Sequence, residues 1–256
     1  MSDLLKGQLC LILGIANKWS LAYAVAEAFS REGADIVVGF LGEQQRSSLI
    51  TLCQDLRIVG MLPCDVTKDD EIVEMGESLA AFGRPLQAVV HSLAFANRED
   101  LARPFVETQR EGYLLAQNVS AYSLVAVARA TAPLMTEGGS IMTMTYLGAT
   151  RVVPMYNVMG VAKAALEASV RYLAADLGGR NIRVNAISAG PVKTASARAI
   201  KDFPTLLSTV ADRSPLHRNT DPAEVADTAV FLASALGRGV TGNVLFVDAG
   251  MHVVGM

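Results

Sequence analysis

Short apolar runs alternate along the chain with longer segments in which apolar residues recur at helical spacing. The apolar runs predict seven strands, at residues 8–13, 35–40, 58–63, 86–91, 140–145, 182–187 and 243–247. The segments between them predict six helices, at residues 21–31, 43–55, 69–82, 110–135, 155–177 and 222–235. Such alternation favours parallel strands joined by right-handed crossovers. The pattern therefore predicts an α/β fold, a Rossmann-type doubly wound parallel sheet of about seven strands with helices on both faces.

One segment interrupts this rhythm. Residues 191–220 are long, mixed in composition and less strand-like, and they follow the end of a predicted strand. Ligands of such folds bind outside the carboxyl ends of the strands, and a loop of this length is more often functional than inert. The segment is therefore predicted to be a lid over a substrate. No repeat, low-complexity tract or linker-like change of composition divides the chain, so residues 1–256 are expected to form a single domain.

The composition fits such a sheet and narrows the classes of partner. Hydrophobic residues make up 51% of the chain and charged residues 18%, as expected where strands are covered on both faces. The formal charge of −3 and the pI near 5.7 give no reason to expect nucleic acid or an anionic membrane as a partner. No apolar run reaches the roughly 18 residues of a membrane-spanning helix, and no cleavable leader is recognisable. A soluble, cytoplasmic protein is expected.

The residues suited to binding a metal are scattered. The three histidines lie far apart, without the spacing of a metal-binding helix. The three cysteines are isolated and show no C-x-x-C spacing, so buried, reduced thiols are expected at Cys10, Cys53 and Cys64. No metal site is predicted.

The first predicted strand runs into a turn of small residues that precedes a helix. Gly14 begins this turn, and Ser20 and Ala22 stand at its end. Such a turn leaves backbone N–H groups at the positive end of the helix, where a pyrophosphate can bind. The spacing is not G-x-G-x-x-G, so this dinucleotide signal is weak by itself. The alternative is that Ser20 is the N-cap of an ordinary helix.

Residues after the next three strands are placed to contact the rest of a dinucleotide. Glu43 lies later than the usual acidic ligand of the ribose and is followed by Arg46, so charge does not choose between NAD and NADP. Asp65 either caps a turn or accepts a hydrogen bond from an adenine amino group. The small residues after His91 would let a ribose pack closely.

Two tyrosines and a lysine stand where an apolar strand gives way to a long helix. If that helix begins near Pro154, Tyr156 and Lys163 lie seven residues apart on one face. A helical lysine leans toward the N-terminus, which brings its ammonium toward the phenol. A phenol beside a cation can donate a proton or stabilise an oxyanion. Taken alone, such a tyrosine is most often a half-buried anchor, and such a lysine is most often solvated.

Together, these motifs resemble the short-chain dehydrogenase/reductase superfamily over nearly the whole chain. Within it they are most similar to the divergent enoyl-[acyl-carrier-protein] reductases of type II fatty acid synthesis. The resemblance rests on Gly14-Ile-Ala-x-x-x-Ser20-Leu-Ala, Cys64-Asp65-Val66, His91-Ser92, Tyr146-Leu-Gly-Ala, Tyr156-Asn-Val-Met-Gly-x-Ala-Lys163, Arg183-Val-Asn-Ala-Ile-Ser-Ala-Gly190-Pro191, Ile200-Lys-Asp-Phe and Val247-Asp-Ala-Gly250. The common dehydrogenases carry Tyr-x-x-x-Lys, but the residue four before Lys163 is Met159. The spacing Tyr-x6-Lys is that of the enoyl reductases.

The resemblance implies a nicotinamide coenzyme, NADH with NADPH as the alternative, and an acyl carrier protein as the partner that presents the enoyl substrate. It also implies a homotetramer built through the long helices. The coenzyme contacts that it implies are Gly14, Ser20, Leu21, Leu41, Asp65, Val66, Ser92, Leu93, Lys163, Val192, Lys193, Thr194, Ala195 and Ser196. Ala96 would touch the substrate. Leu41 replaces a residue that is often polar in the family, so the resemblance does not decide between the two coenzymes.

The resemblance further implies reduction of a trans-2-enoyl thioester, with Tyr156, Tyr146 and Lys163 as the catalytic residues. Tyr156 would donate a hydrogen bond to the enolate oxygen, Lys163 would orient the coenzyme, and Tyr146 would contact the substrate near the thioester. Thr143 lies thirteen residues before Tyr156, roughly where the common dehydrogenases keep a catalytic serine, but a threonine in a strand usually serves packing.

Two alternatives stay open at this point. The chain could reduce a ketone or oxidise an alcohol on the same fold, and the missing Tyr-x-x-x-Lys argues against that. It could instead bind a nucleotide without turnover, and the presence of both Tyr156 and Lys163 argues against that.

Overall fold

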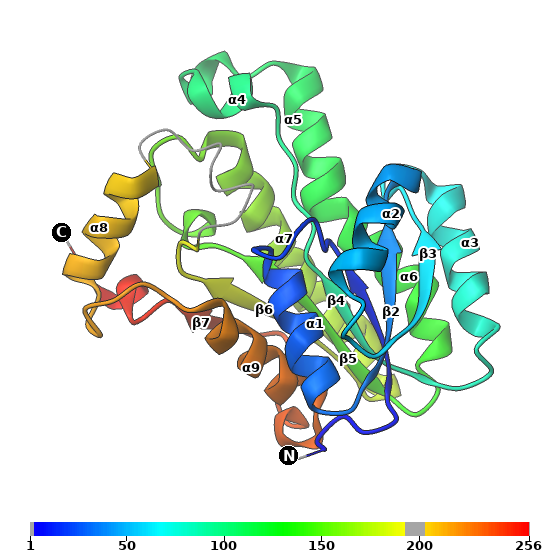
Figure 1. Cartoon of the computed structure of the whole chain (residues 1–256). Coiled ribbons are helices and arrows are strands. Elements are labelled where there is room, and N and C mark those ends of the chain that lie inside the picture. The colour runs from blue at the N-terminus through cyan, green and yellow to red at the C-terminus, as the bar shows by residue number, and fades with distance from the viewer. Residues whose placement is uncertain (1–2, 193–202, 256) are drawn as a thin grey trace.

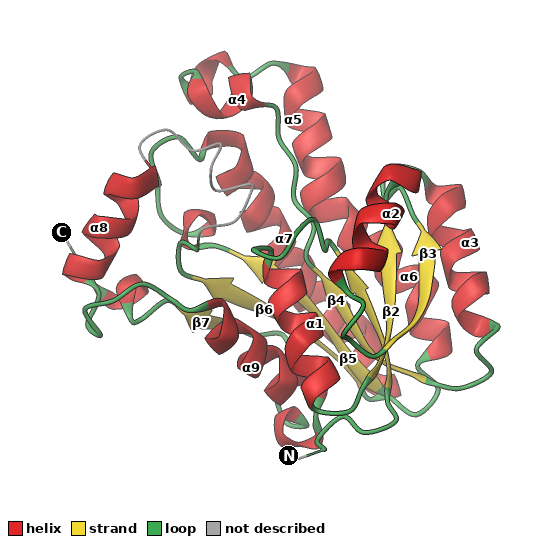
Figure 2. Ribbon diagram, in the orientation of Figure 1, coloured by secondary structure: helices red, strands yellow, loops and turns green. Residues whose placement is uncertain are grey.

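A computed structural model of the protein describes residues 3–192 and 203–255. Its strands form one seven-stranded sheet in which every neighbouring pair is parallel, in the order β3-β2-β1-β4-β5-β6-β7. The strands are β1 Leu9–Leu13, β2 Asp35–Phe40, β3 Ile58–Pro63, β4 Leu86–His91, β5 Gly139–Thr145, β6 Ile182–Ala189 and β7 Val244–Val247. The predicted fold class, a doubly wound parallel sheet of about seven strands, is confirmed (Figures 1 and 2).

Helices cover both faces of the sheet, which explains why the central strands are almost continuously apolar. Every residue of β1 is buried, and so are all but the first residue of β2. Only the edge strands β3 and β7 are largely half-exposed. The main helices are α1 Leu21–Arg31, α2 Gly42–Leu52, α3 Asp69–Ala80, α4 Arg98–Ala102, α5 Arg110–Gln117, α6 Ser123–Thr131, α7 Asn157–Leu177, α8 Phe203–Arg213 and α9 Pro222–Ala233.

Two hydrophobic cores lie on opposite faces of the sheet. Residues of α1, α2 and α9 pack with one set of alternate strand residues, including Cys10 and Ile12. Residues of α3, α6 and α7 pack with the other set, including Leu9 and Leu11. Because side chains alternate along a strand, one short apolar sequence supplies both cores.

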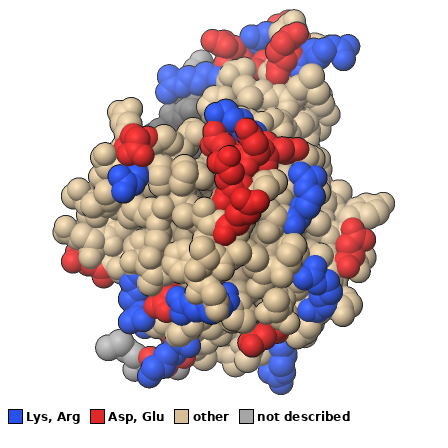
Figure 3. All heavy atoms as spheres, turned by 90° about the vertical axis from the view of Figure 1, so that its right-hand side faces the viewer, with Lys and Arg blue, Asp and Glu red and all other residues tan. Residues whose placement is uncertain are grey.

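The exposed face beside α3 is charged. This helix begins with Asp69, Asp70 and Glu71, whose carboxylates complement the positive end of a helix dipole. Figure 3 shows the side of the molecule to which α3 belongs, with one group of acidic side chains gathered near its upper centre and basic side chains around it.

The helix predicted over 110–135 is present over residues 110–134, but it is not α-helical throughout. The structure has α5, a π-helical segment at Asn118–Tyr122, α6 and a 3-10 turn at Ala132–Leu134. The hydroxyl of Ser123 donates to the carbonyl of Val119 at 2.6 Å, which is the acceptor that an α-helix would offer to its backbone N–H. The N–H of Ser123 bonds instead to the carbonyl of Asn118, five residues back. A side-chain hydrogen bond thus widens the helix at this point.

The helix predicted over 155–177 is present, but it begins two residues later than expected. The helix α7 begins at Asn157, with Tyr156 as its N-cap residue. Met155 and Asn157 have positive φ angles of 62° and 36°, which a regular helix cannot accommodate. The side chain of Asn157 donates to the carbonyls of Leu101 and Arg103 at 2.9 and 2.7 Å, and these bonds hold the irregular start in place.

The segment expected to be a lid, residues 191–220, contains the helix α8. Residues 193–202 of this segment lie outside the described part of the chain. Within the described ranges, no helix combines the length and the apolarity needed to cross a membrane.

The central strands should dominate the stability of this fold. Ile12 is fully buried in β1, whereas Ile50 on α2 is 51% exposed. We expect Ile12→Ala to lower the free energy of unfolding by about 2–5 kcal/mol, because it removes buried apolar surface and leaves a cavity. The matched change Ile50→Ala should cost about 1 kcal/mol or less. Urea denaturation followed by circular dichroism measures both, and equal losses would contradict the assignment of the core.

Candidate active site

The carboxyl ends of all seven parallel strands lie along one edge of the sheet, and the predicted site residues follow these ends. The strand order reverses between β1 and β4, which is the place where doubly wound folds bind their ligands. Gly14 follows β1, Ser92 follows β4 and Tyr146 follows β5. The topology therefore gathers segments far apart in the sequence into one row.

The two tyrosines meet at this edge. The rings of Tyr146 and Tyr156 lie 5.1 Å apart between centroids, with an interplanar angle of 74°. This edge-to-face arrangement is favourable for aromatic pairs. The strand β5 positions Tyr146, and the irregular start of α7 positions Tyr156. The structure thus brings the two tyrosines of this stretch into direct contact.

Two glycines make room for the ring of Tyr156. A Cβ atom on Gly148 would lie 2.4 Å from Cδ1 of Tyr156, too close for any side chain. A Cβ atom on Gly160 would lie 2.8 Å from the carbonyl oxygen of Gly148. The backbone after β5 can therefore approach α7 only with glycine at both positions. Sequence reasoning gave these glycines no role, although Gly148 lies in the Tyr146-Leu-Gly-Ala motif that it singled out.

Lys163 is a buried cation anchored to the same strand. Its side chain is buried, and its Nζ donates a hydrogen bond of 2.7 Å to the carbonyl oxygen of Met144. Burial lowers the pKa of Lys163 from its usual value to about 8, and the negative charge of Glu167 opposes that shift. The ammonium therefore begins to lose its proton slightly above neutral pH.

Both phenols stay protonated over the working range of pH. Burial raises the pKa of Tyr156 far above its ordinary value, and Tyr146 and Glu167 raise it further. Burial also raises the pKa of Tyr146, with a contribution from Asp248. The positive charge of Lys163, which was expected to favour the ionised phenol, does not offset this rise in the pKa of Tyr156. A neutral phenol can donate a hydrogen bond, so the arrangement suits a donor to a developing oxyanion and does not suit a base.

Thr143 does not occupy the place of a catalytic hydroxyl. It is fully buried, its Oγ1 donates to the carbonyl oxygen of His91 at 3.0 Å, and Oγ1 also lies 2.9 Å from Nδ1 of His91. The other ring nitrogen of His91 lies 2.8 Å from Oγ of Ser123. Burial lowers the pKa of His91 to about 3, so the imidazole is neutral. Thr143 therefore serves the interior of the sheet, as its strand position suggested.

The turn after β1 has the shape expected for a phosphate site. Gly14 has a φ angle of +101°, and a Cβ atom there would lie 2.1 Å from the carbonyl oxygen of Ser92. Only glycine permits this contact between the ends of β1 and β4. Ser20 is the N-cap of α1, but its hydroxyl donates to the carbonyl oxygen of Asn17 at 2.7 Å and does not cap the helix. With no acidic residue in the first turn, the N–H groups from Leu21 onward remain suited to an anion.

A glutamine that sequence reasoning missed joins this turn to the end of β2. Nε2 of Gln45 donates to the carbonyl oxygen of Ile15 at 3.0 Å, and its Oε1 accepts from the N–H of Leu41. The side chain of Leu41 is 62% exposed. The only signal in the sequence is an amide one helical turn after Leu41, and it identifies no partner in another loop.

Asp65 caps a turn, one of its two predicted roles. Its Oδ1 accepts from the N–H and the hydroxyl of Thr67 at 3.0 and 2.7 Å. Burial acts to raise the pKa of Asp65, but these hydrogen bonds hold it below its ordinary value. Oδ2 lies 3.8 Å from Nζ of Lys68, too far for a hydrogen bond. The contact of Asp65 with adenine stays a prediction. Val66, which follows, is buried.

The remaining predicted residues are distributed along the same edge. Leu93 and Ala96 are half-buried after β4, and Val192 is buried after β6. The predicted coenzyme contacts Lys193, Thr194, Ala195 and Ser196 lie outside the described residues.

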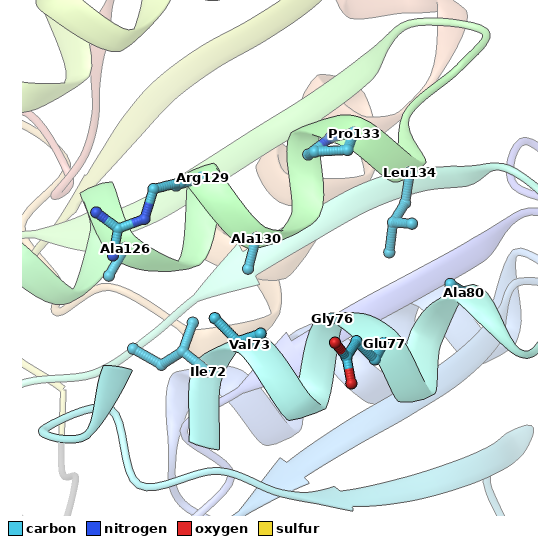
Figure 4. Close-up of a pocket in the computed structure, with 10 residues that line it drawn as sticks. All are labelled: Ile72, Val73, Gly76, Glu77, Ala80, Ala126, Arg129, Ala130, Pro133 and Leu134. Atoms are coloured by element: carbon cyan, nitrogen blue, oxygen red, sulfur yellow. The ribbon is translucent and has the colours of Figure 1, made fainter. Parts of the chain in front are cut away.

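A separate groove lies between α3 and α6 and contains none of the predicted site residues (Figure 4). It is mainly apolar and includes Arg129 and Glu77 at its rim. Within the described ranges, no group of three or more histidine, cysteine, aspartate or glutamate side chains could hold a metal ion.

Comparison with known proteins assigns the family. The family model described as "Enoyl-(Acyl carrier protein) reductase" matches residues 14–252. The chain belongs to this family. This chain is 49% identical over 255 residues to the "Enoyl-[acyl-carrier-protein] reductase [NADH] FabI" of Bacillus cereus, and the match covers 99% of this chain and 100% of the relative. It is 47% identical over 252 residues to the corresponding [NADPH] protein of Staphylococcus aureus, covering 98% of each chain.

Solved structures agree with this assignment. This chain superposes on the Bacillus cereus enoyl-acyl carrier protein reductase with a TM-score of 0.97, at 49% identity and 99% coverage of both chains. That protein was crystallised with NADP+ and indole naphthyridinone. The enzyme from Anaplasma phagocytophilum, crystallised with NAD, gives a TM-score of 0.95 at 43% identity, covering 100% of this chain and 96% of that one.

The glycine at position 148 should be essential for the placement of Tyr156. We expect Gly148→Ala to lower the rate of coenzyme oxidation with an enoyl thioester by about 100-fold, because displacing a reacting group by about 1 Å can cost that much. Gly178→Ala is the matched control, since a Cβ atom at Gly178 meets nothing within 4 Å. A Gly148→Ala variant as active as the control would show that the ring of Tyr156 need not lie where the structure has it.

Proposed function

We propose that Tyr156, Tyr146 and Lys163 carry the reaction of this enoyl-[acyl-carrier-protein] reductase, the NAD(P)H-dependent reduction of a trans-2 double bond in type II fatty acid synthesis. The observation that carries the proposal is the tyrosine pair at the end of β5, with a buried lysine anchored two residues before it. Tyr146 and the turn after β1 both follow the carboxyl ends of strands, and Lys163 is hydrogen-bonded to Met144 near the end of β5.

The coenzyme site fits the residues that would hold it. The close approach of Gly14 to Ser92 and the uncapped first turn of α1 favour a pyrophosphate beside Ser20 and Leu21. Lys163 would hydrogen-bond the hydroxyls of the nicotinamide ribose. When bound, the nicotinamide supplies a hydride to the β-carbon of the enoyl group.

The chain's own residues then handle the charge that develops on the substrate. Hydride addition at the β-carbon would leave an enolate, so negative charge would grow on the thioester carbonyl oxygen, and a proton from solvent would then complete the reduction at the α-carbon. Tyr156 would donate a hydrogen bond to that oxygen, in the way that an oxyanion hole does. Tyr146 would contact the substrate near the thioester and hold the ring of Tyr156 by the edge-to-face contact. The neutral state of both phenols supports these donor roles.

NADH is the coenzyme that we propose, with NADPH as the alternative. Leu41 offers no charge to a 2′-phosphate, and the guanidinium of Arg46 lies 3.4 Å from the carboxylate of Glu43. An acidic neighbour disfavours a phosphate and tolerates a free hydroxyl. Relatives carry both names, [NADH] and [NADPH], and enoyl reduction assayed with each coenzyme tests this choice.

The segment 191–220 is proposed to be the lid over the acyl chain, with the acyl carrier protein as the partner that delivers it. It follows β6 at the carboxyl edge of the sheet, where Val192 is buried. Ala96 follows β4, which is separated from β6 by β5 alone. A cytoplasmic location stays a prediction. No observation favours a ketone reductase, since the hydroxyl of Thr143 is committed to His91.

Loss of the phenol or of the ammonium should affect turnover in different ways. We expect Tyr156→Phe to lower kcat about 10- to 100-fold, as for a hydrogen bond to a charged group, with little change in the KM for NADH. Lys163→Ala should raise the KM for NADH as well. The assay is NADH oxidation with crotonyl-CoA, and Tyr172→Phe on the exposed face of α7 is the control. Wild-type rates in both site variants would disprove the proposed roles.

A homotetramer is proposed from exposed apolar side chains on the long helices. Leu114 on α5 is 58% exposed and Tyr172 on α7 is 76% exposed. Surface of this kind marks interfaces. We expect light scattering to give about four times the chain mass of 27.1 kDa. Tyr172→Glu should shift the protein to smaller species, whereas Ile50→Glu on α2 should not. A monomeric wild-type protein would contradict the proposal.

A further inference from the structure

Three consecutive residues at the end of β5 each contact one residue of α7 or its N-cap: two contact residues within α7 and the third contacts its N-cap residue. The carbonyl oxygen of Met144 accepts from Lys163 at 2.7 Å. The hydroxyl of Thr145 donates to Oε1 of Glu167 at 2.7 Å. The ring of Tyr146 contacts the ring of Tyr156. Two of these ties involve residues already assigned to the reaction, and the middle tie, between Thr145 and Glu167, has no assigned purpose.

Glu167 is an unusual residue for a helix that packs on a sheet. It is buried, with 8% of its surface exposed, and it lies one helical turn after Lys163. In the part of the chain that the structure describes, Thr145 is the only side chain to which it is hydrogen-bonded. A buried carboxylate without a direct ion pair is costly. Burial raises the pKa of Glu167, and the hydrogen bond from Thr145 and the charges of Arg171 and Lys163 oppose that shift. A helix needs no such group for packing, so its presence calls for a role.

The charge of Glu167 acts on Lys163. Burial makes the ammonium of Lys163 less stable, and Glu167 is the group that opposes this effect. The other groups around the pair do not replace it. His91 is neutral, the two phenols are protonated, and the guanidinium of Arg171 donates to the backbone carbonyl of Glu167 at 3.0 Å.

We propose that Glu167 is a positioning residue, held by Thr145, that keeps Lys163 charged and directed at the end of β5, where it binds the ribose of the coenzyme. This inference rests on the proposed role of Lys163. Through it, a buried strand threonine and a buried helix carboxylate set the pH range over which the enzyme binds its coenzyme.

The expected direction of the effect follows from the sign of the interaction. The ammonium form of Lys163 is the active one, so activity falls as the pH rises through the pKa of Lys163, about 8 in the chain alone. Removing the carboxylate lowers that pKa further, so the decline begins at lower pH. Thr145→Val removes a hydrogen bond that favours the ionised form of Glu167. It should shift the decline in the same direction by a smaller amount.

The test compares pH profiles of four proteins: wild type, Glu167→Gln, Thr145→Val and the control Asp176→Asn. Asp176 is an exposed acid near the end of the same helix, so its removal changes the charge of α7 without touching the site. We would measure kcat/KM for NADH with crotonyl-CoA, and NADH affinity by fluorescence, between about pH 6 and 9. Glu167→Gln should move the alkaline decline by about one pH unit, a tenfold change in the equilibrium, and the control should not move it.

Each outcome decides the matter. An unchanged alkaline decline in Glu167→Gln overturns the inference, as does a loss of activity that is uniform with pH, because that is the mark of a merely structural role. If Glu167→Gln does not fold, the profile of Thr145→Val decides by the same criterion. Lys163→Ala, measured beside them, separates the two levels. If it keeps the wild-type profile and NADH affinity, the proposed role of Lys163 fails. If it abolishes the decline while Glu167→Gln leaves it in place, only the inference about Glu167 fails.

Discussion

The hydrogen bond from Lys163 to the carbonyl oxygen of Met144 is the contact on which the site depends. It joins the longest helix to the end of a central strand and places a cation in a nearly dry environment. A buried ammonium needs acceptors, and the last carbonyl groups of a parallel strand can supply them where the ladder of the sheet ends. The position of this strand end therefore fixes where the cation can lie, and Tyr146 follows Met144 two residues later.

Coverage of the sheet on both faces explains why the chemistry is confined to one edge. Each central strand is apolar along its length, so polar groups of the sheet can face a ligand only where the strands end. Inside the sheet, Thr143 is hydrogen-bonded to His91, and the imidazole of His91 stays neutral. The carboxyl edge is therefore the place where turns, helix starts and side chains from β1 to β6 meet.

Close backbone approach gives the site its precision. Gly14 lets the ends of β1 and β4 touch, and Gly148 with Gly160 lets the loop after β5 press against Tyr156. The left-handed residues on either side of Tyr156 add conformational strain, which the side-chain bonds of Asn157 sustain. The phenol is thus fixed by a backbone that few other sequences could adopt.

The sequence by itself determined the fold class, the strand boundaries to within two residues and the family, because the apolar period and the motif order are local properties of the chain. It also singled out Tyr146, Tyr156 and Lys163. The tertiary structure alone decided how these residues meet. The π-helical segment at Asn118–Tyr122 depends on the hydroxyl of Ser123, and the late start of α7 depends on carbonyls near α4. Likewise, the partners of Gln45 and Glu167 belong to other elements, and periodicity carries no information about contacts between distant segments.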